Sequence, residues 1–288
     1  QHLAFKELAK RRNARSTQTG IFGDIACIRG LVADCVRYGT VPFSVLARYG
    51  FVAIAILRDL AKNGILTNRE HDEFLSHIPT IATKISADLR AFQSGELEAK
   101  DFVSRYGHLR PGSYDITAPT YKDMAEAGNF TGNSVNTEME AETGDISHAQ
   151  AIWDNRSSEI DRFLKQNGMT FTSATLFNFI VKAVPNRELG KFEFTKSLAE
   201  ILERTASFGE ALGFSREDIA YTSIDTLLRL GSSNMHSVLK EELSRSINYE
   251  KKRHSITQAI RLPPLIGASE DISAFNIREA RPNFVTQN

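Results

Sequence analysis

Cysteine is scarce in this chain, and the two that occur are badly placed for a bond. The 288 residues contain only Cys27 and Cys35, which stand at i and i+8 in a segment of helical periodicity. That spacing excludes an intrahelical disulfide and a CxxC metal pair. We therefore expect two buried free thiols, as is usual in a reducing, cytoplasmic compartment.

An excess of charge of one sign is also missing. Lys and Arg number 35, Asp and Glu number 35, and the formal net charge is zero. No global field would attract nucleic acid or an anionic membrane. The most apolar window, residues 49–57, is far shorter than the roughly 20 residues of a membrane span. We expect neither nucleic acid nor a membrane as a partner.

The motifs of common enzyme classes are absent too. The chain has no GxSxG, P-loop, HExxH or GxGxxG, so it shows no obvious nucleophile and no nucleotide cradle. The histidines have no metal-ligand spacing, because His71 and His77, for example, are too far apart on a helix. We expect no metal and no cofactor to be bound by this chain.

Strand alternation is lacking, and helical periodicity dominates. Ile25, Ile28 and Val32 fall on one stripe, and residues 43–62 are apolar nearly all round, which predicts a central buried helix. Capping boxes at Thr67 and Ser215 mark helix starts. Helices are predicted at 43–62, about 67–92 with a kink or break at Pro79, 97–104, 147–165, 173–183, 187–212, 224–230 and 236–260.

The predicted fold is all-α: a multi-helix, bundle-like domain with long irregular loops and an extended C-terminal tail. Residues 1–120 form an N-terminal helical block, and residues 146–262 a C-terminal one. Between them, residues 121–145 are rich in Gly, Asn, Thr and Glu, which predicts a mobile loop. Residues 263–288 are predicted to be a tail with one short helix that begins at Ser269.

The run 105–119, RYGHLRPGSYDITAP, gathers polar side chains on a frame of Gly and Pro, which is typical of a loop that builds a site. His108 and Asp115 could form an acid–base pair, and Arg105 and Arg110 could bind a phosphate or carboxylate. The alternative is structural. In that case Asp115 caps a turn while the arginines attach the loop to neighbouring helices.

A second polar group follows Pro185. Arg187 and Lys191 stand at i and i+4, on one face of a helix that is predicted to begin here. Free N–H groups and the dipole of a helix N-terminus favour anions, so two added cations would suit a phosphate, with Glu188 holding Lys191. The alternative is a solvated face carrying a weak ion pair.

A third candidate is Arg48, which lies inside the apolar segment 43–62. A buried charge needs a partner. Arg48 either reaches into a polar site or pairs with a carboxylate such as Asp24 or Asp59.

Four sequence elements, taken in their order along the chain, resemble a known family. They are GTVPF at 39–43 with Arg48, YGHLRPGSYD at 106–115, Arg187-Glu188 with KFEFT at 191–195, and RPNFVT at 281–286. The chain from about residue 20 onward resembles the middle region of phosphoenolpyruvate synthase/pyruvate phosphate dikinase-like phosphotransferases. It is most similar to the capsule-associated glutamine kinases, and more distantly to rifampin phosphotransferase. The element at 106–115 is the most specific part.

The resemblance implies an ATP-dependent kinase-type enzyme that uses ATP and Mg. In it an ATP-grasp domain phosphorylates a histidine on a swivelling domain, and that phosphohistidine donates to a small-molecule acceptor bound by the helical region. His108 lacks the surroundings of the phosphorylated histidine, which we expect beyond residue 288, and the 288 residues contain no ATP-grasp sequence. The chain alone is therefore expected to be catalytically incompetent. An amide, a hydroxyl, pyruvate or a capsule sugar remain open as acceptors.

The resemblance and the residue chemistry together select the candidate site residues. Catalytic candidates are His108, Asp115 and Glu188. Substrate- and phosphate-binding candidates are Arg48, Tyr106, His108, Arg110, Tyr114, Arg187, Glu188 and Lys191. The alternative function is a helical spacer between catalytic domains with no small-molecule site. An acceptor site requires the loop and the Arg187 group to meet in one pocket, whereas a spacer would leave them apart.

Overall fold

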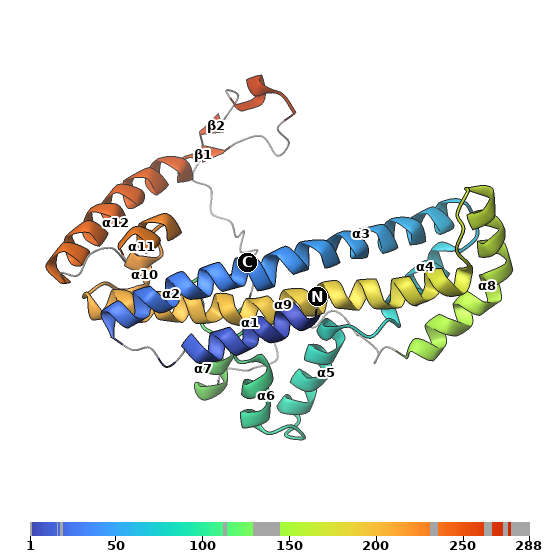
Figure 1. The fold of residues 1–288 in the computed structure, drawn as a ribbon, viewed down its shortest axis with the longest axis horizontal. Helices are drawn as coiled ribbons and strands as arrows, with labels where there is room; N and C mark the ends of the chain where they lie inside the picture. Colours follow the sequence, from blue (N-terminus) through green and yellow to red (C-terminus); the bar gives the residue numbers. More distant parts are fainter. Residues whose placement is uncertain are drawn as a thin grey trace, which may run out of the picture.

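The protein is built from α-helices, and the predicted all-α class is confirmed (Figure 1). The computed structural model describes residues 2–15, 17, 20–111, 114–128, 145–230, 236–261, 267–272 and 276–277. Within these ranges the β-structure is one short antiparallel pair, β1 (Ile260–Arg261) with β2 (Asn276–Ile277). The short helix predicted at Ser269 is a 3₁₀ helix, Ser269–Ile272.

Two long helical elements form the spine of the molecule. The first is continuous through α2 (Ile21–Cys35), the π-helical turn η1 (Val36–Thr40) and α3 (Val41–Lys62). The second is α9 (Ser173–Ala211), which lies beside it (Figure 1). The short α1 (His2–Arg15) packs on α2, η1 and α9.

Glycines allow the two spine elements to approach closely, and their contacts show that the elements are antiparallel. Gly50 lies against Arg187, and Gly39, in η1, lies against Phe194 farther along α9. A Cβ built on Gly39 would lie only 2.8 Å from the Cβ of Phe194. A larger side chain at this crossing would therefore push η1 away from α9.

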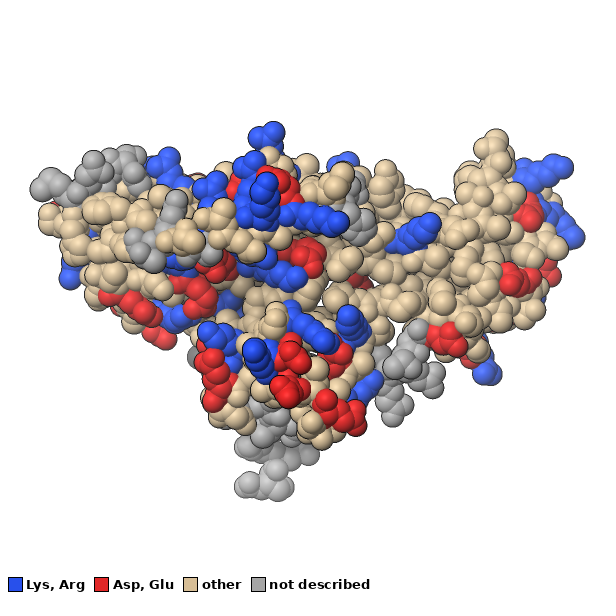
Figure 2. Space-filling view, turned by 60° about the horizontal axis from the view of Figure 1, so that its bottom comes forward, with Lys and Arg blue, Asp and Glu red and all other residues tan. Residues whose placement is uncertain are grey.

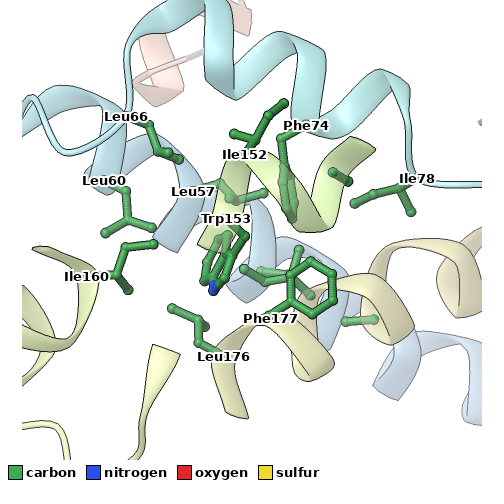
Figure 3. Close-up of a cluster of buried hydrophobic side chains, with 14 of the residues drawn as sticks. Leu57, Leu60, Leu66, Phe74, Ile78, Ile152, Trp153, Ile160, Leu176 and Phe177 are labelled. Carbon is green, nitrogen blue, oxygen red and sulfur yellow. The ribbon is translucent and has the colours of Figure 1, made fainter. Parts of the chain in front are cut away.

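One end of the spine is closed by α4 (Asn68–Ser76) and α8 (Ile146–Gln166). Figure 3 shows the apolar core that these helices form with the ends of α3 and α9. Trp153 lies at its centre, 5.3 Å from the ring of Phe74, and its indole N–H donates to the carbonyl of Ser173 at 3.1 Å. Leu57 and Phe177 complete the contact between the two predicted blocks.

Two further groups of helices pack along α9. The first group holds α5 (Ile81–Gln93), α6 (Ala99–Tyr106) and α7 (Tyr121–Glu126), whose core around Phe102 also contacts Phe192 of α9. The second group, at the far end, holds α10 (Arg216–Ile219), α11 (Ile224–Leu230) and α12 (His236–Gln258). Its core combines Phe208 of α9 with Ile25 of α2. The predicted N- and C-terminal blocks therefore share their cores.

Capping chemistry places several boundaries where they were predicted. Thr67 and Ser215 each form a reciprocal capping box, with Glu70 and Asp218 respectively. Pro79 divides the predicted segment 67–92 into α4 and α5, because proline cannot donate the backbone hydrogen bond that a continuous helix needs.

Three expectations about individual elements are wrong. Pro185 does not separate two helices, since α9 continues through it. The loop predicted from residue 121 begins with α7, which Thr120 caps through Asp123, while residues 129–144 lie outside the described residues. The segment 43–62 is not buried all round, because Tyr49, Phe51 and Val52 are 50–60% exposed.

The continuous helix Ile21–Lys62 also has the length and apolar composition of a membrane-crossing helix, and 22% of its most apolar window is buried. Core helices of soluble proteins share these properties. Figure 2 shows acidic and basic side chains interspersed on one face of the molecule, in keeping with the zero net charge.

Candidate functional site

The loop between α6 and α7 is fixed to the spine by a shared carboxylate. Arg110, whose side chain is 3% exposed, donates to Glu203 of α9 and, at 3.1 Å, to the carbonyl of Ala118. Arg216 of α10 binds the same carboxylate at 2.7 Å and the carbonyl of Ile116 at 3.3 Å. Arg110 is thus committed to holding the loop in place, as the structural alternative predicted.

Tyr106 and Asp115 also make hydrogen bonds that hold the segment around the loop between α6 and α7 in place. The hydroxyl of Tyr106 donates to Asp88 at 2.7 Å, and Arg105 donates to the same carboxylate at 2.9 Å. The carboxylate of Asp115 accepts the backbone N–H of Thr117 at 2.9 Å and its hydroxyl at 2.8 Å. These bonds lower the pKa of Asp115. Asp115 caps a turn, so the proposed His108–Asp115 acid–base pair is wrong.

His108 contacts α9 instead of Asp115. Its ring packs edge-on against Phe192, with 4.9 Å between the ring centroids, and it bonds to the backbone of Phe192. Burial, helped by the cations Lys196 and Arg12, lowers the pKa of His108 to about 3. The imidazole is therefore neutral, and its Nε2 is buried without a hydrogen-bond partner among the described residues.

Arg12 of α1 and Lys196 of α9 lie near this imidazole. The ammonium of Lys196 lies 4.6 Å from the centroid of Phe192, on which His108 also packs, and it pairs with Glu193 at 2.8 Å. Arg12 is close enough to His108 to depress its pKa. We call Arg12, His108 and Lys196 the basic cluster.

Arg12 differs from its neighbours in having no ion-pair partner among the residues that the structure describes. Arg11 and Arg15 bind Asp34 at 3.3 and 2.8 Å, whereas Arg12 makes no hydrogen bond or ion pair with any side chain that the structure describes. Burial lowers the pKa of its guanidinium. The nearest carboxylates are Glu193 and Glu200, and both are engaged elsewhere.

Tyr114 and Cys35 lie at the edge of the basic cluster. Cys35 is buried, donates weakly to the carbonyl of Phe194 at 3.9 Å, and feels the charge of Arg12. Burial raises the pKa of this thiol to about 11, and burial likewise raises the pKa of Tyr114, which is near Cys35. Both predicted thiols, Cys27 and Cys35, are free and buried. Neither is ionised near neutral pH, so Cys35 is not an activated nucleophile.

A groove of about 440 Å³ lies beside the basic cluster, between α1, α3 and α9. Phe5, Lys6, Ala9, Leu46, Asn186, Leu189, Gly190 and Glu193 line it. The small residues keep it open: a Cβ on Gly190 would lie 3.0 Å from Leu46 and 3.2 Å from Phe5. Glu193 connects the groove to the basic cluster, because it pairs with Lys196 and acts on Arg12.

The other predicted residues lie on a different side of α9. The guanidinium of Arg187 is 5.0 Å from the centroid of Phe51, and its side chain packs on Gly50. Since α9 is continuous here, Arg187 is not at a helix N-terminus, and the predicted anion site of that kind is wrong. Lys191 is exposed and Glu188 half-buried.

The structure therefore separates the predicted cations. Glu203, which holds Arg110, follows Arg187 by sixteen positions of α9, or about 24 Å along the helix axis. Arg48 is exposed, not buried, and neither suggested carboxylate is shown to pair with it; Asp24 binds Arg204 at 2.9 Å. Among the described residues, no group of three His, Cys, Asp or Glu side chains could hold a metal ion.

Sequence reasoning found His108 and missed Arg12 and Lys196. Arg12 belongs to a basic segment without a recognisable motif, and Lys196 follows the KFEFT run directly. Only the packing of α1 and the loop onto α9 brings the three together. No known protein family, no characterised protein and no solved structure matches this chain.

Proposed function

We propose that this chain is the helical acceptor-side region of a cytoplasmic, ATP-dependent phosphotransferase of the phosphoenolpyruvate synthase type. The basic cluster carries the proposal, because the cations Arg12 and Lys196, from separate segments, lie near the neutral imidazole of His108, whose Nε2 has no partner among the described residues. Phosphoryl transfer depends mainly on positioning and on positive charge around the transferred group. From the resemblance at residues 106–115 we infer that the partners are ATP-grasp and phosphohistidine domains, and that these domains use ATP with Mg.

In this proposal His108 orients the acceptor. A neutral imidazole carries one N–H, and a bond to the Phe192 carbonyl uses it. Nε2 is then an acceptor, which a hydroxyl or amide N–H of the bound molecule would reach only by displacing the side chains that cover this buried atom. Arg12 and Lys196 would stabilise the incoming phosphoryl group. Arg187, Glu188 and Lys191 are assigned to docking of the phosphorylated domain, since Lys191 is exposed on another side of α9.

The test uses an enzyme that contains this chain together with the ATP-grasp and phosphohistidine domains. His108→Gln should leave AMP release and phosphohistidine formation intact and slow discharge to amide, hydroxyl or keto-acid acceptors by about 10²- to 10⁴-fold. His254→Gln, on the exposed surface of α12, is the control. Loss of phosphohistidine itself would move His108 to the ATP half-reaction and refute the assignment.

A second candidate function is a helical spacer that holds catalytic domains apart. The separation of about 24 Å along α9 between Arg187 and Glu203, the partner of Arg110, favours it, because an acceptor site formed by the two arginines would need them together. A spacer would show wild-type discharge in both His108→Gln and Arg12→Gln. The acceptor-side proposal requires that both variants be slow.

A further inference from the structure

The groove between α1, α3 and α9 has the size and lining of a small-molecule site. Its volume of about 440 Å³ falls in the usual range for ligand pockets, which are mostly apolar with a few polar groups. Phe5, Leu46 and Leu189 supply apolar walls, and Gly190 supplies a floor that any side chain would obstruct. Such a surface suits an aliphatic or aromatic body.

One end of the groove is polar, and its position follows from the residues that α1 places along the groove. Ala9 lines the groove, and Arg12 stands at i+3 from Ala9, so it lies on the same face of α1 one turn farther on. Glu193 lines the groove from the opposite side and acts on Arg12. A ligand that fills the groove therefore ends beside Arg12.

Arg12 needs an anion that the described chain does not supply. Its nearest carboxylates, Glu193 and Glu200, are bound at 2.8 and 2.9 Å by Lys196 and Arg204. The uncharged groups around it are His108 and Cys35. A half-buried guanidinium without an ion-pair partner is unfavourable, and an anionic head group would supply a charge-assisted bond.

We propose that this groove binds a small amphiphilic acid, whose apolar body contacts Phe5, Leu46 and Leu189 and whose anionic head is bound by Arg12. The role of such a molecule as phosphoryl acceptor rests on the proposed function. Its binding does not.

The experiment is calorimetric titration of the whole chain with hexyl phosphate. Hexyl phosphate should bind about tenfold or more tightly than inorganic phosphate, which lacks the tail, or hexyltrimethylammonium, which has the opposite charge. Arg12→Gln should weaken hexyl phosphate by about tenfold or more, since a bond to a charged group is lost. Ala9→Trp should abolish binding by filling the groove.

Lys10→Gln is the matched control, because Lys10 is an exposed cation of the same helix. Circular dichroism reports whether each variant folds, and Arg12→Gln keeps the test valid if Ala9→Trp does not fold. Equal binding of the anionic and cationic probes would overturn the proposal, as would wild-type affinity in Arg12→Gln. Binding to anionic phospholipid vesicles with none to hexyl phosphate would also overturn it, in favour of a lipid surface.

The two proposals can fail separately. If hexyl phosphate binds as expected but His108→Gln discharges normally in the longer enzyme, the groove binds a ligand that is not the acceptor. If discharge depends on His108 but hexyl phosphate does not bind, the acceptor-side function stands and the amphiphilic class is wrong.

Discussion

At the residue scale, two arginines of the candidate site show opposite use of a buried charge. Arg110 is fully engaged, with Glu203 and the Ala118 carbonyl as partners. Arg12 is half-buried, and its neighbouring carboxylates, Glu193 and Glu200, are bound by the other cations Lys196 and Arg204. A satisfied buried charge fixes structure, and an unsatisfied one is a place for a ligand. Because of this difference, we expect a ligand to contact Arg12, whereas the sequence had favoured Arg110.

The buried imidazole of His108 makes stability depend on pH. Its folded pKa is about 3, below the unfolded value of about 6.5. Between these two pH values the imidazole of His108 is protonated in the unfolded chain and neutral in the folded protein. The stability that the neutral imidazole contributes to the folded state is therefore complete above about pH 6.5 and is lost as pH falls toward 3. Urea unfolding at pH 7 and pH 4.5 should show a smaller pH-dependent loss for His108→Gln than for wild type.

Carboxylates also lose their hydrogen bonds and ion pairs in acid, which destabilises both proteins. The test is therefore the difference in pH-dependent stability loss between wild type and His108→Gln. The exposed variant His254→Gln should keep the wild-type difference between pH 7 and pH 4.5. If His108→Gln and wild type lose the same stability, the imidazole is not held neutral by its surroundings.

At the element scale, the crossing of η1 over α9 depends on Gly39. Gly39→Ala brings a Cβ to 2.8 Å from the Cβ of Phe194, which cannot move without its backbone, so we expect a loss of roughly 1–3 kcal/mol. Gly50→Ala is the matched control, since its nearest atom, at 3.0 Å, is the flexible Cδ of Arg187. Chemical denaturation should rank Gly39→Ala as the less stable variant. The reverse order would contradict the packing described for this crossing.

Local chemistry predicts elements better than it predicts the site. The capping boxes of Thr67 and Ser215 and the break at Pro79 act within a few residues, so they were visible in the sequence. The helix through Pro185 was not, because proline usually ends a helix and here long-range packing along α3 supports it. The basic cluster joins three distant segments, which no local pattern reports.

At the scale of the whole molecule, the two predicted blocks fold as one unit. Leu57 and Trp153 share one core, and Ile25 and Phe208 share another. If the chain is cut at a protease site placed within residues 129–144, both pieces should elute together in gel filtration and separate only in denaturant. Separation in native buffer would show that the blocks are independent domains.

The antiparallel spine has a mechanical consequence. Its first element, Ile21–Lys62, has 42 residues and so extends about 63 Å at the usual helical rise. It packs against α9 through α2, η1 and α3. A load applied at the α4–α8 end would be passed to the α10–α12 end as displacement, with little bending between. The spine would therefore behave as a rigid rod, and any partners attached at its two ends would move together.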